Sequence, residues 1–420
     1  MDFFQLPLGP VTLENVTIPA CVLGLPGDLI RTSLSLGGGQ IVTDQAMAID
    51  MRGAMVLPAF VDMHTHLDKG QIWGRSPNPD GTFPGALGAA GNDREQYWTA
   101  EDLRRRMDFA LRCAFAHGTR AIRTHLDSIP PQDAISWPIF AEMRSEWAGR
   151  VDLQAASLAG CDMVLDPAFE TLADRVAAYR GVLGLFTYPM PDLPDRLRHM
   201  FRLAADRGLN VDFHADETMD PTVNTLSQIA QAALDTGFRG RIAAGHCCSL
   251  SAMADDAALQ TLDLVARAGI SIVSLPMCNL YLQDRHSGRT PRARGITLVH
   301  EARARGINVA FASDNTRDPF YAYGDLDMVE VLREATRIAH LDHSADDWVQ
   351  SVLATPAKTC GFDLPSLAPG APADLVMFRA RNWTELFSRP QSDRVVVRAG
   401  RQIDRTLPDY GELDDLMRTA

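Results

Sequence analysis

The chain has 420 residues, 46% of them hydrophobic, and a formal net charge of −13. This charge excludes nucleic acids and anionic membrane surfaces as expected partners, because both require a basic protein surface. The seven cysteines are scattered without a C-x-x-C pair, and the N-terminal segment lacks both a basic stretch and a long apolar run. We therefore expect a cytoplasmic protein with reduced core thiols, no signal peptide and no transmembrane span.

Short strand-like segments with glycine turns occupy both flanks of the chain. They lie within residues 11–58 and again within 373–405, where the sequences ADLVMF and RVVVRAGRQID occur. Neither flank could bury a hydrophobic face alone. We therefore predict a small composite β-sandwich domain built from residues 1–58 and 365–420, beside a central domain of residues 59–364.

The centre of the chain alternates strand-like and helix-like segments. Amphipathic stretches such as 100–118, 194–208 and 259–269 end in glycine just before the next strand, as a helix C-cap does. This alternation predicts an α/β fold, a parallel (β/α)8 TIM-type barrel whose chemistry lies at the C-terminal ends of its strands. The predicted strands are residues 59–66, 120–127, 152–159, 181–188, 210–216, 242–248, 271–276 and 308–314.

A long stretch rich in glycine, proline and aromatic residues follows the first barrel strand directly, at residues 68–98. Loops of this length inside a compact domain are usually functional. We predict that this stretch is a loop that forms a lid or a wall of the substrate pocket.

Four of the predicted strands end in side chains that could hold one metal ion. His64 and His66 point to one face of a strand, because strand side chains alternate with a period of two. His214, His246 and Asp314 end three later strands. Imidazole and carboxylate donors suit Zn²⁺ or Fe²⁺, so this pattern predicts one divalent metal ion in a hydrolase.

The remaining polar groups of this site suggest how protons could move. Glu217 follows His214 by three residues and is placed to carry protons between water and substrate, with Asp216 as a rival carboxylate that geometry alone does not exclude. Asp314 could bind the metal and also accept a proton. His246 could be a ligand or an orienting base, and we favour the base, because catalytic sites keep an open position for water.

His125 also ends a predicted strand, in the sequence RTHLD. It could bind a second metal ion, but a binuclear site usually needs a lysine or a glutamate at a strand end. None of the predicted strands ends in either residue. We therefore favour a single ion, with His125 supporting the ligands from behind.

These residues resemble a known family. In chain order, PAFVDMHTHLDKGQ, RAIRTHLD, VDFHADET, AAGHCCSL and FASDNTRDPFYAYGDLDM are similar to the metal and catalytic motifs of the amidohydrolase superfamily. The stretch CNLYLQDRHSGRTPRARGIT at 278–297 and the sequence DN-x-RDPFYAYG resemble the cytosine deaminase branch. The resemblance covers nearly the whole chain, including the closing G-x-x-ADLVMF motif.

The resemblance implies a role for each residue of the site. Glu217 would move a proton from water to a ring nitrogen, and His246 would hold the attacking hydroxide. The implied reaction is the hydrolytic deamination of a cytosine-like ring, such as cytosine or 5-methylcytosine, with release of ammonia. The implied metal ligands are His64, His66, His214 and Asp314.

Three departures from the branch fall on positions that read the substrate. Cytosine deaminases carry a glutamine after the third strand that reads the ring amide, whereas this chain has Leu158 and Gly160 near that place. Asn315 stands where the branch has an aspartate, and Phe320 where it has a tryptophan. Because a site that reads polar edges discriminates strongly, these changes put cytosine itself in question and keep 5-methylcytosine open.

Two glutamines, Gln71 and Gln283, remain to hold a polar ring, although Gln283 could instead brace a loop. One alternative is an amidohydrolase acting on an N-substituted amino s-triazine of the ammelide type, or on a cyclic amide or amidine. A second is a catalytically silent binding barrel, which the complete set of expected ligands disfavours. A homo-oligomer is compatible with such a barrel, but the sequence does not predict the oligomeric state.

Overall fold

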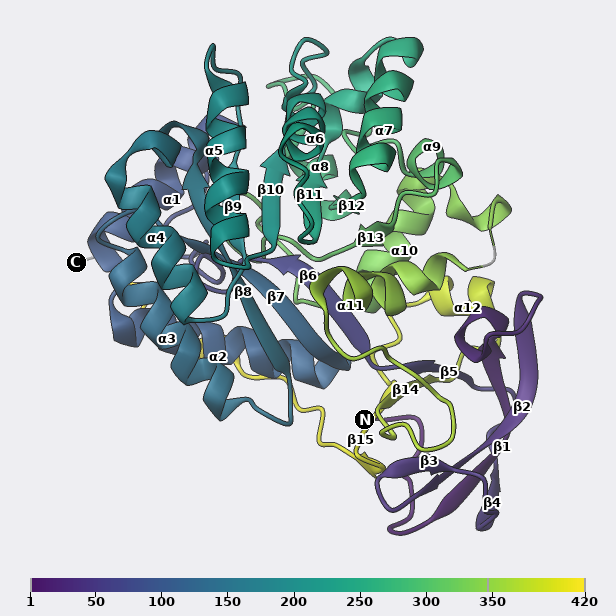
Figure 1. Ribbon diagram of the computed structural model, residues 1–420. Helices are drawn as coiled ribbons and strands as arrows, with labels where there is room; N and C mark the ends of the chain where they lie inside the picture. The colour runs from purple at the N-terminus through teal and green to yellow at the C-terminus, as the bar shows by residue number, and fades with distance from the viewer. Residues whose placement is uncertain (1, 346, 419–420) are drawn as a thin grey trace.

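Eight parallel strands form a barrel in the computed structural model, which describes residues 2–345 and 347–418 (Figure 1). All eight strands predicted from the sequence are present, each within a few residues of its expected limits. In barrel order they are β6 (Phe60–Thr65), β7 (Thr119–Asp127), β8 (Asp152–Gly160), β9 (Leu183–Phe186), β10 (Val211–Ala215), β11 (Ile242–His246), β12 (Ile270–Ser274) and β13 (Val309–Phe311).

The barrel closes between its first and last strands. A parallel bridge joins Thr65 to Asp314, just beyond the end of β13. The backbone N–H of Asp314 donates to the His64 carbonyl at 2.8 Å, and the Thr65 hydroxyl donates to the Asp314 carbonyl at 2.7 Å. This closure brings the start and the end of the barrel sequence together at the site of the candidate ligands.

Amphipathic helices cover the outside of the barrel (Figure 1). α2 shows why they form where they do, since the Thr99 hydroxyl accepts from the Asp102 N–H at its start and Gly118 ends it with a φ of 98°. Among the described residues, no helix is both long and apolar enough to cross a membrane. The outer helices are α2 (Ala100–His117), α3 (Asp133–Glu146), α4 (Pro167–Ala178), α5 (Leu193–Asp206), α6 (Thr225–Thr236), α7 (Asp255–Ala268), α9 (Val299–Ala304), α10 (Met328–Ala339) and α11 (Ala354–Cys360).

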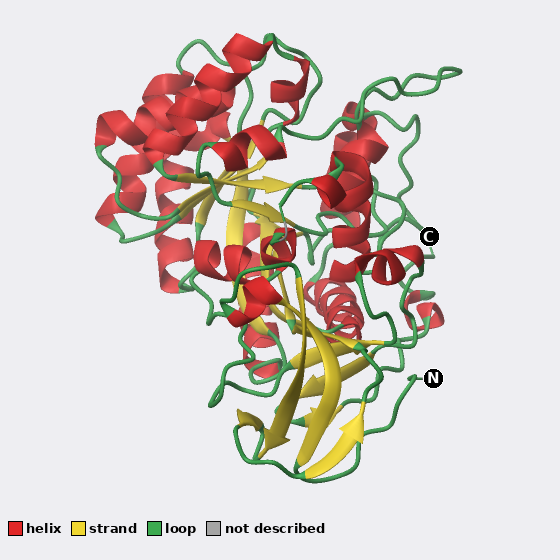
Figure 2. Cartoon of the chain, turned by 90° about the vertical axis from the view of Figure 1, so that its right-hand side faces the viewer, coloured by secondary structure: helices red, strands yellow, loops and turns green. Residues whose placement is uncertain are grey.

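A second sheet lies beside the barrel and combines both flanks of the chain, as Figure 2 shows below the helical region. β14 pairs antiparallel with β5, so a C-terminal strand joins an N-terminal one directly. The sequence analysis missed β2, the long antiparallel partner of β1. The strands are β1 (Val11–Pro19), β2 (Leu29–Gly37), β3 (Gln40–Val42), β4 (Met47–Asp50), β5 (Met55–Pro58), β14 (Leu375–Phe378), β15 (Val395–Arg398) and β16 (Arg401–Gln402).

This composite sheet has its own hydrophobic core, in which Leu13 and Val16 from one flank pack with Leu375 and Val397 from the other. Beyond β16 the chain returns to the barrel, where Arg105 on α2 forms an ion pair with Asp415 at 2.6 Å. The predicted domain limits at residues 58 and 365 stay a prediction. All seven cysteines are free, and six of them are buried.

The stretch 68–98 is not a continuous loop, because it contains the helix α1 (Phe83–Tyr97). The Thr82 hydroxyl accepts from the Gly85 N–H, and Ala86 and Ala90 are buried on its inner face. The glycines and the proline in its first turns lower its helix propensity, so the composition of the stretch did not predict a helix. Two further short α-helices are α8 (Pro276–Leu282) and α12 (Trp383–Ser388). The described residues also contain short 3-10 helices at Ala20–Leu23, Cys161–Leu165, Cys248–Ala252, Leu341–His343, Trp348–Val352 and Tyr410–Leu413.

Candidate active site

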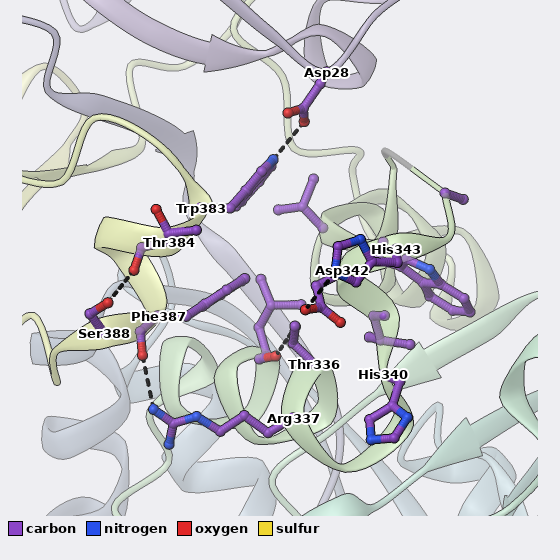
Figure 3. A pocket seen from close by; sticks show the side chains of 15 residues that line it. Asp28, Thr336, Arg337, His340, Asp342, His343, Trp383, Thr384, Phe387 and Ser388 are labelled. Atoms are coloured by element: carbon purple, nitrogen blue, oxygen red, sulfur yellow. Dashed lines mark hydrogen bonds and ion pairs between the residues drawn. The ribbon is translucent and has the colours of Figure 1, made fainter.

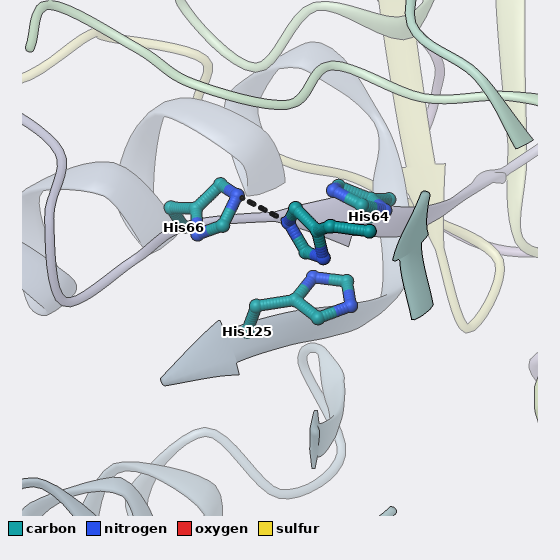
Figure 4. Close-up of side chains that lie close together, drawn as sticks. His64, His66 and His125 are labelled. Atoms are coloured by element: carbon teal, nitrogen blue, oxygen red, sulfur yellow. Dashed lines mark hydrogen bonds between the residues drawn. The ribbon is translucent and has the colours of Figure 1, made fainter. Parts of the chain in front are cut away.

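The C-terminal ends of the barrel strands bring the candidate metal ligands together (Figure 4). His64 and His66 extend from β6, and His66 Nε2 lies 3.3 Å from His214 Nε2 on β10. Asp314 Oδ1 lies 3.3 Å from His66 Nε2 and 3.5 Å from His64 Nε2. Two overlapping groups have donor atoms within 4.8 Å of one another: His64, His66, His125 and His214, and His64, His246 and Asp314.

The backbone at this site adopts conformations that cost energy. Asp314 and His246 both lie in the left-handed region, with φ of 62° and 69°. Such conformations for residues other than glycine cluster at functional sites, where the surrounding structure holds them. Gly245 is needed next to His246, because a Cβ there would come within 2.7 Å of the His64 ring.

The donor atoms at this site are buried and lack hydrogen-bond partners among the described residues. They include both ring nitrogens of His64, Nδ1 of His66 and of His214, and both carboxylate oxygens of Asp314. Burial and the neighbouring histidines lower the pKa values of His64 and His214 well below the usual range, so both rings are neutral. Neutral imidazoles and an unpaired carboxylate are the donors that a divalent cation requires, so the residues fit such an ion.

Glu217 lies beside the cluster, with Oε1 3.4 Å from His246 Nδ1. Burial, and then the nearby Asp314 carboxylate, raise the pKa of Glu217 well above its ordinary value, which suits a group that must carry a proton. The amide of Asn279 donates to His246 Nδ1 at 3.0 Å, so the ring proton sits on Nε2.

The rival carboxylate has a different task. Asp216 turns away from the cluster and accepts from the Thr225 and Leu226 N–H groups at 2.7 and 3.1 Å. These groups begin α6, so Asp216 satisfies orphan donors at a helix N-terminus. The geometry therefore favours Glu217 as the proton carrier.

A buried polar chain runs behind the cluster. His125 Nε2 lies 3.1 Å from Asp212 Oδ1, and Asp212 Oδ2 accepts from Arg123 Nη1 at 2.9 Å. The ring centroids of His125 and His64 are 4.0 Å apart. His125 is thus near enough to be a donor itself and is also held by Asp212 from behind, an arrangement that orients metal-binding groups.

A cavity of about 230 Å³ opens above the cluster. Part of its wall is aromatic, since Phe83 on α1 stacks on Phe186 at 6.0 Å and meets Phe320 edge-on at 5.6 Å. A mostly apolar pocket with few convergent polar groups is the usual form of a small-molecule site. α1 therefore forms a wall of the pocket, as was predicted for the stretch that contains it.

Comparisons with known proteins agree with this architecture. Residues 139–404 match the profile of the Amidohydrolase family. The chain is 52% identical to the pterin deaminase of Rhizobium rhizogenes over 422 residues, which cover 96% of each chain. The chain belongs to the amidohydrolase family. It is therefore an enzyme, a hydrolase that acts on C–N bonds.

Two further relatives of this amidohydrolase extend the comparison. N-isopropylammelide isopropyl amidohydrolase from Pseudomonas sp. is 25% identical over 335 residues, 75% of this chain and 76% of that protein. The crystal structure of 5-methylcytosine deaminase from Klebsiella pneumoniae has a TM-score of 0.80 at 24% identity, and covers 95% of this chain and 98% of that one. The latter shows that the fold is shared. The predicted superfamily and barrel are confirmed.

Metal dependence follows from the family. Amidohydrolases depend on metal ions, and the described part of this chain contains a buried histidine cluster with suitable donors.

The predicted substrate-contacting residues divide into two groups. Leu158, Gly160, Asn315 and Phe320 line the cavity of this amidohydrolase. The two glutamines are not among the lining residues. Gln71 is buried with an unpartnered amide, whereas the Gln283 amide donates to the Glu217 carbonyl at 3.3 Å and braces that loop, as the alternative interpretation expected.

Sequence reasoning missed three charged residues that also line the cavity. Lys69 Nζ lies 3.1 Å from Asp127 Oδ1, and Arg94 Nη1 donates to Asp127 Oδ2 at 3.0 Å. A signal for two of them was present, because Asp127 ends β7 and Lys69 follows β6 by four residues. Arg94 gave no signal, since its place depends on the unexpected helix α1.

Proposed function

We propose that this amidohydrolase is a metal-dependent deaminase of a 2-amino-4-oxo ring of the pterin type. The observation that carries the chemistry is Glu217 beside His246 and Asp314, at the base of a cavity lined by aromatic side chains. The 52% identity to a pterin deaminase supports the choice of ring. Cytosine and 5-methylcytosine, expected from the sequence, carry the same arrangement of an amino carbon, a ring nitrogen and a carbonyl.

The metal site in this proposal is built from the ends of two strands, β6 and β10, and from the barrel closure at Asp314. When bound, a divalent ion supplies Lewis-acid activation of a water molecule. Neutral imidazoles with one carboxylate suit Zn²⁺ or Fe²⁺ equally. The proposed ligands are His64, His66, His214 and Asp314.

The chain's own residues then move the protons. The second oxygen of Asp314 accepts a proton from the attacking water, while Glu217 passes one to the ring nitrogen beside the reacting carbon. His246, whose Nε2–H faces away from Asn279, donates to the oxygen that joins that carbon. Asp314 then passes its proton to the amino group and Glu217 takes the remaining hydroxyl proton. The carbon–nitrogen bond breaks as the carbon–oxygen double bond forms, so water replaces the amine and ammonia leaves.

The departures noted in the sequence agree with a larger ring. Leu158 and Gly160 form a wall without a long polar side chain, and Phe320 takes less space than the tryptophan of the cytosine deaminase branch. Both changes provide room for a second, fused ring. The composite sheet, proposed as a domain of residues 1–58 and 365–420, contributes none of the residues that line this cavity.

The test is ammonia release by the purified, metal-loaded enzyme from pterin, cytosine, 5-methylcytosine and an ammelide-type triazine. We expect pterin to react with a kcat/KM above about 10⁴ M⁻¹s⁻¹ and at least tenfold faster than the single rings. Release of an alkylamine from an N-alkyl triazine, with pterin inert, would instead support the triazine alternative. Inertness towards the whole panel with metal bound would overturn the proposal.

A further inference from the structure

Lysine is almost absent from this chain. Of its 40 basic residues, 38 are arginines, and the two lysines are Lys69 and Lys358. Lys358 is exposed on α11, whereas Lys69 is only 6% exposed and lines the cavity of the candidate active site. Lysine and arginine are not interchangeable at such a place, because an ammonium is a compact donor and a guanidinium is a wide, planar one.

The ammonium of Lys69 keeps spare hydrogen-bonding capacity. Its ion pair with Asp127 Oδ1, at 3.1 Å, is its one polar contact in the part of the chain that the structure describes. The Phe320 ring lies 5.0 Å from Nζ and holds the cation on another side. An ammonium has three N–H groups, so two remain to meet a ligand in the cavity.

Two other donors in the cavity walls are engaged or lie farther out. The Asn315 amide donates to Asp318 at 2.7 Å. The Arg94 side chain is 18% exposed against 7% for Lys69, so Arg94 lies nearer the opening. Lys69 and Glu217 line the same cavity.

We propose that Lys69 binds the ring carbonyl of the substrate, the group that a glutamine reads in the cytosine deaminase branch. The inference rests on the proposed function and assigns the specificity of that same site. In a 2-amino-4-oxo ring, one ring nitrogen separates the amino-bearing carbon from the carbonyl carbon. With the amino carbon facing the metal cluster, the carbonyl oxygen lies farther along the same ring edge, where a donor in the cavity wall can meet it. An ionised donor makes this hydrogen bond stronger than an amide would.

A pair of ligands separates this role from a structural one. Pterin carries the carbonyl, and 2-aminopteridine has the same ring and amino group without it. We expect Lys69→Met to lower kcat/KM for pterin by about 10²-fold and to change kcat/KM for 2-aminopteridine less than about threefold. Lys69→Arg should recover only part of the loss. The matched control is Lys358→Met, which removes the one other lysine and should leave both values unchanged.

The metal content of each variant must equal that of the wild type, which excludes a loss of the ion as the cause. An equal loss on both ligands, or no loss on pterin, would overturn the role of Lys69 and leave the proposed function standing. A wild type that deaminates neither pterin nor 2-aminopteridine would overturn the proposed function itself, and with it the role of Lys69.

A second measurement needs no active-site variant. With two lysines, a ¹⁵N spectrum of the ammonium groups in the metal-loaded protein has two signals, which Lys358→Arg assigns. Saturation with 2,4-dioxopteridine, the deaminated product of pterin, should shift the Lys69 signal and leave the Lys358 signal in place. An unchanged Lys69 signal at saturation would contradict a hydrogen bond from Lys69 to the ring.

Discussion

The cavity at the barrel mouth and a larger cavity elsewhere on the molecule differ in volume and in the pairing of their polar groups. The larger one, about 680 Å³, lies between α10, the segment 340–349 and α12 (Figure 3). Several of its polar groups are paired: Trp383 Nε1 donates to Asp28 at 2.6 Å, and Arg337 donates to the Phe387 carbonyl at 3.0 Å. The smaller cavity, about 230 Å³, lies over buried donor atoms that have no partners among the described residues.

The volume of a cavity therefore does not indicate where the reaction takes place. Polar groups removed from water and left unpaired cost free energy, so a fold retains them where a ligand or ion will complete them. Paired groups at a solvated surface carry no such demand. Substitutions in the two cavities should therefore differ by orders of magnitude in their effect on turnover.

The largest expected effect comes from the barrel closure. Asp314→Asn should lower kcat/KM by at least about 10³-fold and reduce the bound metal below one ion per chain, because a neutral amide replaces the anionic donor. The matched control is Asp342→Asn, the same change at an exposed residue of the larger cavity. Full activity of Asp314→Asn with stoichiometric metal would remove Asp314 from the site.

Glu217→Gln should follow, with kcat lowered by about 10²–10⁴-fold and the metal content unchanged, because it removes the proposed proton carrier but none of the proposed ligands. Asp216→Asn is the neighbouring comparison. Since Asp216 accepts from the start of α6, its substitution should lower the free energy of unfolding by about 1 kcal/mol and affect kcat far less. A loss below about tenfold in Glu217→Gln would exclude it from proton transfer.

Removing an ion pair at the start of α10 should lower the free energy of unfolding without changing turnover. The side chains of Asp327 and Arg394 are 12% and 1% exposed, with Asp327 Oδ2 2.6 Å from Arg394 Nη2. Although burial alone would raise the pKa of Asp327, Arg394 and His117 hold it below the ordinary value. Asp327→Asn should lower the free energy of unfolding by about 3 kcal/mol at pH 7, because it leaves a buried cation unpaired.

The sign of the pH dependence follows from that lowered pKa. The carboxylate stabilises the folded state fully above the ordinary aspartate pKa of about 3.9, and its contribution is lost as the pH falls towards the folded value. The difference between wild type and Asp327→Asn in chemical unfolding should therefore shrink below about pH 4. The control is Asp393→Asn, which breaks an exposed pair with Arg379 and should cost less than about 1 kcal/mol.

The smallest effect should come from the larger cavity itself. Arg337→Met should leave kcat/KM within about twofold and the free energy of unfolding within about 0.5 kcal/mol, because the Arg337 side chain is 54% exposed. Steady-state kinetics and thermal unfolding measure both. A tenfold loss of turnover would contradict the contrast between the two cavities and would show that the larger cavity contributes to function.

The barrel and its polar cluster could be predicted from the sequence because both follow from local patterns of residues along the strands. His64 and His66 share a face because of the period-two alternation of a strand, and parallel strands place their C-terminal ends at one edge. Arg94 became visible only in three dimensions, because its place depends on the helix α1, whereas the positions of Lys69 after β6 and of Asp127 at the end of β7 were a signal in the sequence. The helix α1 was hidden by its glycines, and β2 by a polar, half-exposed sequence that lacks a continuous apolar face.

The bridge between Thr65 and Asp314 joins residues 249 positions apart. Three histidines can approach one another as soon as β6 and β10 are in place, but the carboxylate arrives only when the last strand docks. Contacts of such long range form late in folding, because the intervening chain must be ordered first. With His64, His66, His214 and Asp314 as the proposed ligands, uptake of the ion reports that the barrel is complete. A chain that stops short of its eighth strand has an incomplete set of donors, and a fully loaded molecule has closed its barrel.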